Sequence, residues 1–382
     1  MYLSIDVYSG NSKFIHKYMI DWLDITIPCV HLPIEQGRYI VVEHDGEVLR
    51  ESSVRRRVEG SYCTSIAVSS VTPSLPRAAL SLPASTVAKL FPLPDLPPGY
   101  VSHLSFSGNP TKYLQGHNCF GIDCLRTLAG RMVADVMPRL GFDAVTVARV
   151  LQRIDALDFE VSRVDITRMF ALGSDEDVQD YLYMLPLTVK ARGNRCSNSH
   201  DTFYVGQSST LWTLKFYNKW RELQSRSKHH SLPDELKLSG IDEFVKGQLR
   251  VELTLRKKQL DRYQLTNAAK LQEKISELFI EHAGKIDMTN QSINEKKLLE
   301  LSNTYQGTYQ LWKSGYNMMT HLSRATYYRH RAELLKYGID IAKTPINAEV
   351  RRAVIEPLIK HLIPREVKEI PAELQPYLLK VA

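Results

Sequence analysis

Apolar and polar residues alternate without a break along residues 249–256. The apolar positions are Leu249, Val251, Leu253 and Leu255, and the polar positions are Arg250, Glu252, Thr254 and Arg256. Because successive side chains of a β-strand point to opposite faces, this alternation predicts a strand with one buried face and one polar face.

Residues 161–167 and 212–219 show the same alternation. Their polar faces carry charged or hydroxyl-bearing side chains, namely Arg163, Asp165, Thr167, Lys215, Tyr217 and Lys219. We therefore expect three neighbouring strands in an antiparallel sheet that has helices packed on its apolar face, which is an α+β fold. The other face of the sheet is the expected working surface.

Helical spacing of apolar residues predicts helices within residues 122–151, 231–247 and 265–297. The first of these segments contains two helices, and the second helix begins at Asp143. Nearer the N-terminus, residues 19–28 are typical of a strand and residues 39–50 of a hairpin. Seven prolines between residues 71 and 100 exclude a long central strand or helix there and predict a loop excursion.

The C-terminal region carries helical patterns without strand alternation. Ser323 is a favourable N-cap and Gly338 a favourable stop, so one helix fits between them. Two helical segments precede it, and it resembles the recognition helix of a helix-turn-helix. A capped amphipathic surface helix is an equally good interpretation. We expect its apolar stripe to consist of Tyr328, Ala332 and Leu335. The exposed face is expected to carry Arg324, Tyr327 and Arg331.

These patterns divide the chain into three parts. Residues 1–18 are a weakly patterned extension, residues 19–290 form the α+β domain, and residues 291–382 form an all-α region. The boundary near residue 290 follows from the end of strand alternation.

Composition narrows the class of protein. The chain has 382 residues with 43% apolar and 24% charged residues, which is typical of a folded globular protein. Its net charge of +7 suits a polyanionic partner without requiring one. Five cysteines without a CxxC pair indicate reduced thiols, and no apolar run is long enough for a membrane span or a signal peptide. We expect a cytoplasmic protein that does not contact a membrane.

The polar face of residues 249–256 carries a carboxylate between two guanidinium groups, and Tyr263 follows seven residues after Arg256. These groups could support a metal-assisted attack of tyrosine on a phosphodiester. Plainer interpretations are that Asp165 and Glu252 form salt bridges on a solvated face and that Tyr263 packs.

Six stretches of the sequence resemble a known family. They are residues 19–23, 108–121, 162–165, 214–219, 249–252 and 378–382. The most specific is the Leu-Gln-Gly-His-Asn-x-Phe-Gly block within residues 114–121, because no general rule of folding requires it. The chain resembles replication initiators of the filamentous-phage gene II and gene X type, which are related to the Rep_trans rolling-circle plasmid initiators.

The resemblance implies an HUH-endonuclease-like core at residues 19–290 that nicks one strand of a double-stranded origin, forms a 5′-phosphotyrosine and later rejoins the displaced strand. It makes Tyr263 the expected nucleophile, assisted by Arg250, Lys219 and Tyr217. In the phage gene II proteins the tyrosine does not fall at the same offset, so the assignment stays open. Tyr305 and Tyr309 are competitors.

No His-hydrophobic-His pair lies on a predicted strand, so the implied metal ligands are Asp165 and Glu252, with His117 as a third. Such ligands suit Mg²⁺ or Mn²⁺. The expected DNA contacts are Arg163, Lys215, Arg256, Lys112, Arg324, Tyr327 and Arg331.

A host helicase, a DNA polymerase and a single-strand-binding protein are implied partners, since the chain has no Gly-x-x-x-x-Gly-Lys loop. The competing class is a non-enzymatic origin or operator binder with a regulatory or replication role. Its binding would survive loss of the sheet carboxylates and would leave no covalent product. The sequence leaves the oligomeric state open.

Overall fold

The computed structural model describes residues 18–34, 39–42, 48–52, 56–59, 64–71, 96–97, 99–190, 196–199, 202–225, 230–284, 287–288, 301–335, 337, 339–342 and 368–379. Residues 1–17 of the predicted N-terminal extension, most of the proline-rich excursion and the domain boundary near residue 290 lie outside these ranges.

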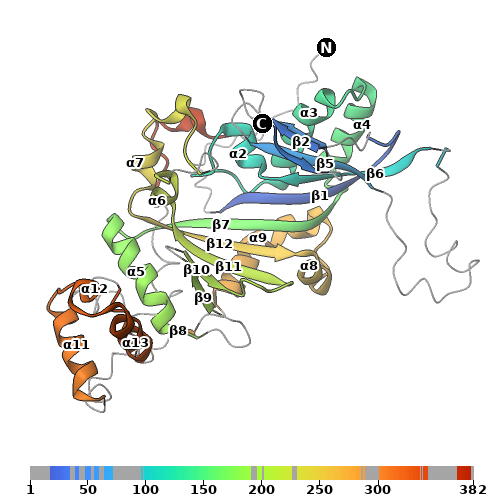
Figure 1. The fold of residues 1–382 in the computed structure, drawn as a ribbon. Coiled ribbons are helices and arrows are strands. Elements are labelled where there is room, and N and C mark those ends of the chain that lie inside the picture. The colour runs from blue at the N-terminus through green and yellow to red at the C-terminus, as the bar shows by residue number, and fades with distance from the viewer. Residues whose placement is uncertain are drawn as a thin grey trace, which may run out of the picture.

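A nine-stranded antiparallel sheet is the frame of the molecule, with the strand order β4-β5-β6-β1-β7-β12-β11-β10-β9 (Figure 1). Its strands are β1 (Met19–His31), β4 (Arg56–Glu59), β5 (Ser65–Val71), β6 (Val101–Gly108), β7 (Glu160–Ala171), β9 (Cys196–Ser199), β10 (Thr202–Val205), β11 (Trp212–Asn218) and β12 (Gln248–Arg256). The three predicted neighbours are adjacent, and β12 lies between β7 and β11. The predicted antiparallel sheet is therefore confirmed.

Four short strands complete the set. Strands β2 (Tyr39–Val42) and β3 (Val48–Ser52) form the predicted hairpin. Strands β8 (Val189–Lys190) and β13 (Asp287–Met288) form a second two-stranded sheet.

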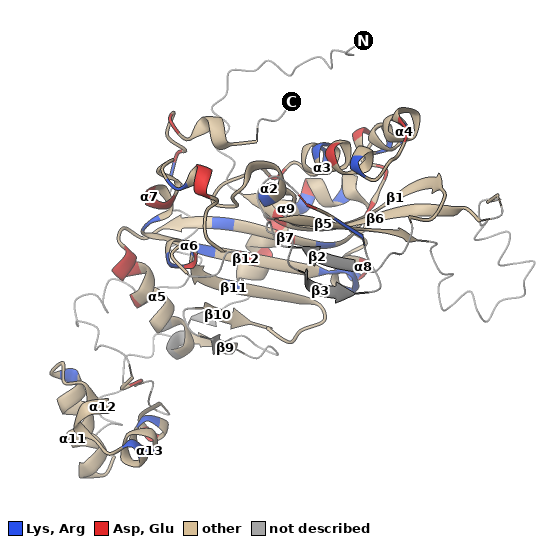
Figure 2. Cartoon of the chain, turned by 45° about the horizontal axis from the view of Figure 1, so that its top comes forward, with Lys and Arg blue, Asp and Glu red and all other residues tan. Residues whose placement is uncertain are grey.

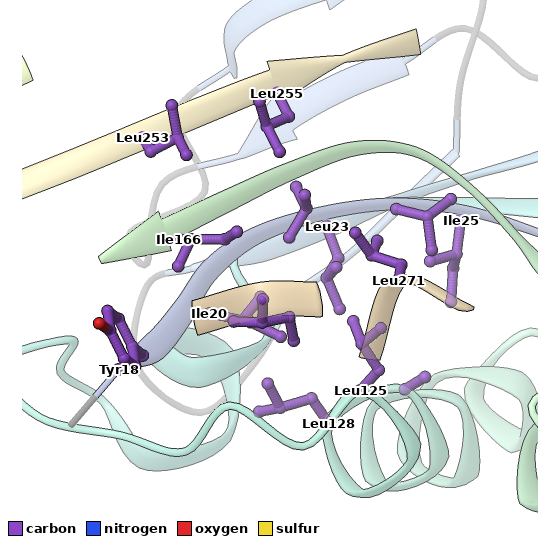
Figure 3. Packing of buried hydrophobic residues seen from close by; sticks show 14 of the residues in the cluster. Tyr18, Ile20, Leu23, Ile25, Leu125, Leu128, Ile166, Leu253, Leu255 and Leu271 are labelled. Atoms are coloured by element: carbon purple, nitrogen blue, oxygen red, sulfur yellow. The ribbon is translucent and has the colours of Figure 1, made fainter. Parts of the chain in front are cut away.

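Helices cover the apolar face of the large sheet, as the alternation predicted. They include α2 (Pro110–Gln115), α3 (Leu125–Arg139), α4 (Ala144–Asp155), α5 (Asp175–Thr188), α8 (Lys257–Tyr263) and α9 (Ala268–Gly284). Figure 3 shows Leu23, Ile166 and Leu253 of the sheet in one core with Leu125 and Leu271 of the helices. Burial of this apolar surface is the main source of stability for the fold.

Local sequence signals explain where several of these helices begin. The Asp143 carboxylate accepts hydrogen bonds from the N–H groups of Val145 and Thr146, which caps α4. Ser174 and Asp177 form a reciprocal capping box at the start of α5. Both helices therefore start where polar side chains satisfy the free N–H groups.

One end of the polar face is covered by a second, smaller core. Met169 of β7 packs there with Phe120, Ile241, Val245 and other apolar residues. The elements above it are α6 (Lys219–Leu223), η2 (Asp234–Leu236), α7 (Ile241–Val245) and the C-terminal η3 (Gln375–Tyr377). The helical pattern predicted for residues 231–247 yields only the two short elements η2 and α7, because Pro233 and Gly240 interrupt it.

The C-terminal helices α11 (Asn303–Lys313), α12 (Met318–His321) and α13 (Arg324–Leu335) have a core of their own. The prediction of the buried stripe on α13 was wrong. Tyr327, His330 and Leu334 are buried, whereas Tyr328 and Leu335 are 47% and 44% exposed. Propensity and capping located this helix, but packing against α11 and α12 decided its rotation.

None of the helices in the described ranges is long and apolar enough to cross a bilayer.

Candidate active site on the open face of the sheet

Two carboxylates face the open side of the sheet on adjacent central strands. In the sheet register Asp165 of β7 lies opposite Thr254 of β12, and Glu252 of β12 lies opposite Thr167 of β7. The two acids are therefore diagonal neighbours, a relation that places Cβ atoms about 7 Å apart. Strand alternation alone put both on this face.

Asp165 is almost fully buried and accepts two hydrogen bonds from Arg163, at 2.9 Å from Nε and 2.7 Å from Nη2. Burial raises the pKa of the Asp165 carboxyl to about 7, and the charge of Glu252 adds to the effect while Arg163 opposes it. Two acids held close together in a poorly solvated place are a common feature of catalytic sites and of cation sites.

The phenol of Tyr217 on β11 lies beside Glu252. Its hydroxyl donates to Oε2 of Glu252 at 3.4 Å, which is long for a hydrogen bond between oxygens. The Lys215 ammonium lies 4.0 Å from the centre of the Tyr217 ring. Burial raises the pKa of Tyr217 well above its ordinary value, although the charge of Arg250 opposes the rise. The site thus brings a tyrosine, an acceptor carboxylate and a cation together.

Arg250 was predicted to assist catalysis, but in the structure its side chain is buried and holds neighbouring elements of the site together. It is fully buried, it donates to the backbone oxygen of Asn118, and its Nη2 lies 2.9 Å from Oδ2 of Asp21. Asp21 also accepts hydrogen bonds from Asn109 at 2.6 Å and Asn118 at 2.8 Å. This network ties β12 to β1 and to the loop that follows α2.

Lys219 belongs to the same buried network. Its ammonium donates to Oδ1 of Asn118 at 2.8 Å and to Oε2 of Glu222 at 2.5 Å, and only 2% of the residue is exposed. Its prediction as a catalytic cation therefore needs correction, because the ammonium is held by partners inside the structure. Lys112 lies close by on α2, where burial and the charge of Lys219 lower its pKa.

Tyr263 does not reach the carboxylates. It is the last residue of α8, its hydroxyl donates to Glu281 of α9 at 2.9 Å, and its ring packs against His282. His282 in turn packs on Trp212, whose side chain points to the helix-covered face. The sheet therefore separates the Tyr263 hydroxyl from Glu252, and its prediction as the partner of these carboxylates was wrong.

His117 also has a different place from the predicted one. Its Nε2 donates to the backbone oxygen of Tyr377 at 3.1 Å, while Nδ1 accepts from the N–H of Cys119 at 3.3 Å. Burial lowers the pKa of His117 to about 4, so the ring is neutral. Both nitrogens serve to fix the loop, and His117 is not available as a metal ligand.

Apart from Lys112 on α2, the predicted DNA contacts fall into two groups. Arg163, Lys215 and Arg256 lie on the open face, as expected. In the C-terminal unit Arg324 is exposed, but Tyr327 is buried in the small core and Arg331 pairs with Asp340 at 2.7 Å. The two competing tyrosines are likewise in that unit, where Tyr305 packs on His330 and Tyr309 on Trp312.

Asp21 and Trp22 were not among the predicted site residues. The register shifts between Ile20 and Trp22, so two residues of β1 oppose one of β7. This bulge lets Asp21 pair with Arg250 while Trp22 lies opposite Asp165. Both residues belong to the stretch 19–23 that carried the family resemblance, and that was the available signal.

The side chains fit a divalent cation of the magnesium type only as a two-carboxylate site. The described residues hold no group of three or more His, Cys, Asp and Glu side chains that could bind a metal. Asp165 and Glu252 remain, and the hydroxyl of Thr167 beside them is buried without a hydrogen-bond partner. Mg²⁺ is commonly held by one or two carboxylates together with water and substrate phosphates, so this donor set fits.

The open face carries a tyrosine, two neighbouring acids and the basic residues Arg163, Lys215 and Arg256, and Figure 2 marks the Lys and Arg positions along the ribbon. Such groups define a class of protein suited to a ligand that carries phosphates. Two family models match the chain. They describe the N-terminal part of the phage replication-associated gene II protein, over residues 19–274, and the C-terminal part of the same protein, over residues 293–373. The chain belongs to this family of replication-associated proteins, which confirms the expected resemblance to phage replication initiators.

A sequence relative agrees with this assignment. The replication-associated gene II protein of Enterobacteria phage I2-2 is 34% identical over 346 residues, which cover 90% of this chain and 93% of the relative. A solved rolling-circle replication initiator protein from Geobacillus stearothermophilus is 13% identical, over 73% of this chain and 90% of that one, with a TM-score of 0.27. A TM-score this low supports no residue correspondence.

Proposed function

We propose that this protein initiates rolling-circle DNA replication by cutting one strand of its origin and remaining attached to the 5′ end through Tyr217. The observation that carries the proposal is the 3.4 Å contact between the Tyr217 hydroxyl and Glu252 on the open face. Family membership supplies the replication role.

The proposed step is a transesterification at the scissile phosphate. Glu252 accepts the phenolic proton while Oη of Tyr217 attacks phosphorus, and the bond from phosphorus to the 3′ oxygen breaks. The proton that Glu252 accepted passes to the 3′ oxygen, which leaves as a free hydroxyl. Because the phosphodiester is exchanged and not hydrolysed, the reverse step with a new 3′ hydroxyl rejoins the displaced strand.

Because the pKa of Tyr217 is raised, the proposed reaction requires a group that removes the phenolic proton. A buried phenol with a pKa well above 10 loses its proton only with help from neighbouring groups. Glu252 is the adjacent acceptor, and Lys215 is the cation nearest the ring that can stabilise the phenolate and the charge on phosphorus. Asp165 and Glu252 are the proposed ligands of Mg²⁺ or Mn²⁺, which when bound would polarise the phosphate.

The origin duplex and a single strand are the proposed DNA partners. The chain contains no phosphate-binding loop for a nucleotide, so strand separation and synthesis fall to the host helicase, polymerase and single-strand-binding protein. In the C-terminal unit the exposed Arg324 and Arg329 of α13 are the proposed contacts to duplex DNA. They replace Tyr327 and Arg331, whose side chains are engaged within the protein.

A matched pair of variants tests the nucleophile. Supercoiled origin plasmid is incubated with the wild type, Tyr217→Phe or Tyr263→Phe in Mg²⁺ buffer, and nicked circles are counted on a denaturing gel. We expect Tyr217→Phe to abolish nicking and Tyr263→Phe to keep it. Loss of nicking in Tyr263→Phe alone, with both variants folded by circular dichroism, would contradict the proposal. Binding of the origin without nicking by the wild type would favour the non-enzymatic class.

A further inference from the structure

At the end of the open face away from Met169, two arginines stand opposite each other. Arg163 of β7 and Arg256 of β12 are register partners, and Asp24 of β1 is the next position in the same row. Tyr217 and Glu252 lie further along the same face toward the covered end. The arginine pair therefore adjoins the candidate site, which Arg163 contacts through Asp165.

The nearby carboxylates of Asp165 and Asp24 lie beside Arg163 and form no direct ion pair with Arg256 in the described part of the chain. Arg163 donates both of its hydrogen bonds to Asp165, and Arg256 has no ion-pair partner in the described part of the chain. Arg256 donates to the Thr213 hydroxyl at 2.9 Å, and burial together with the charge of Arg163 lowers its pKa. Two like charges on facing strands repel, and an anion between them would relieve the repulsion.

An aromatic ring completes the arrangement. The Arg163 guanidinium lies 4.9 Å from the centre of the Trp22 ring. The indole N–H donates to Oδ1 of Asp24 at 2.8 Å, and the same oxygen accepts from Ser107 at 2.6 Å. Because Asp24 is held by these two donors, the indole is fixed in orientation while part of it remains exposed.

We propose that Arg163, Arg256 and Trp22 form a subsite for single-stranded DNA, in which the arginines hold one backbone phosphate and the Trp22–Arg163 stack receives its base. The inference rests on the proposed function, since it assigns a second contact to the strand that Tyr217 attacks. Arginine pairs suit phosphate oxygens, and bases stack on aromatic rings and guanidinium planes.

Stacking of this kind selects a single strand over a duplex. In a duplex both faces of each base are covered by neighbouring base pairs, so a fixed ring on a sheet can meet only a base that has left the stack. The subsite would thus hold a nucleotide next to the cut in unpaired form and keep the strand in line with Tyr217.

Binding to an oligothymidylate tests the subsite without using the cutting reaction, because this probe contains no origin sequence. The full-length protein is titrated against labelled oligothymidylate by fluorescence anisotropy at several salt concentrations. Arg256→Gln should lower the slope of log affinity against log salt by about 0.7, the value for one lost phosphate contact to a single strand. Arg126→Gln, at an exposed position on helix α3, is the matched control and should leave the slope unchanged.

Two substitutions at Trp22 separate stacking from folding. Trp22→Leu should weaken binding of the oligothymidylate about 5-fold to 150-fold, the range for one lost stacked base, whereas Trp22→Phe should retain most of the affinity. The wild type should also lose part of its tryptophan fluorescence on binding, and Trp22→Phe should lose less, since Trp22 is one of only four tryptophans.

The possible results test the DNA subsite separately from nicking by Tyr217. An unchanged salt slope in Arg256→Gln, or equal affinity in Trp22→Leu and wild type, would overturn the subsite while leaving nicking by Tyr217 intact. Equal losses for duplex and oligothymidylate would also overturn it, because the contact would then be to the backbone of any DNA. A changed slope in a protein that forms no adduct with origin DNA would retain the subsite and refute the proposed function.

Discussion

The buried ion pair between Arg250 and Asp21 allows a quantitative prediction about stability. Replacing Arg250 by Met preserves much of the side-chain volume but leaves the Asp21 carboxylate, which is 7% exposed, without its cation. Breaking one partner of a buried ion pair costs about 3 to 5 kcal/mol. Asn109 and Asn118 still donate to Asp21, so we expect a value near the lower end, about 3 kcal/mol.

Urea unfolding followed by circular dichroism measures this loss. With a urea dependence of about 3 kcal/mol per molar, the midpoint of Arg250→Met should fall by about 1 M. Arg256→Met removes a half-buried arginine that has no ion-pair partner in the described ranges, so its midpoint should change by less than about 0.3 M. The double variant Arg250→Met with Asp21→Asn should recover part of the loss, because no unpaired charge remains.

The pH dependence follows from the direction of the Asp21 pKa. Burial alone would raise that pKa, but the charges of Arg250 and Lys219 and two hydrogen bonds outweigh burial and lower it. A lowered carboxyl pKa stabilises the fold above the unfolded value near ~4, and the stabilisation is lost as the pH falls through the folded value. The difference in urea midpoint between the wild type and Arg250→Met should therefore become smaller at acidic pH. Equal midpoints at neutral pH, or a double variant no more stable than the single one, would contradict a stabilising role of the Arg250–Asp21 pair.

Three further predictions concern other parts of the molecule. The pKa of His117 is lowered to about 4, so its neutral form stabilises the fold above pH 6.5, and this contribution is lost as the pH falls toward 4. In His117→Gln the urea midpoint should therefore depend less on pH between these two values than it does in the wild type. Gly247→Ala should cost about 2 kcal/mol or more by the same urea assay, because Gly247 has a φ of +71° and an added Cβ would collide with the backbone oxygen of Gly173. Arg329→Gln on the exposed face of α13 should lower the salt slope of duplex binding by about 0.9, and an unchanged slope would remove this helix from the interface.

The alternation of side chains was sufficient to predict the central sheet and which of its faces is polar. For Asp165, Glu252 and Tyr217 the period of two residues decides the face, and no other information is needed. The helices α3 and α4 followed from helical spacing and from Asp143 as an N-cap. These features depend on local sequence.

The features that the sequence could not predict depend on contacts between distant segments. Tyr263 follows β12 closely in sequence, but α8 turns it toward α9 on the covered face. His117 is fixed by Tyr377, 260 residues later. The bulge at Asp21 and the rotation of α13 likewise depend on packing between elements, which periodicity does not encode.

The residue that becomes covalently linked to DNA identifies the nucleophile. Wild-type protein is incubated with Mg²⁺ and an origin substrate, the covalent product is digested with nuclease and trypsin, and the modified peptide is identified by mass spectrometry. We expect a nucleotide on the peptide that contains Tyr217, between Lys215 and Lys219. A nucleotide on the peptide that begins at Tyr263 would contradict this expectation.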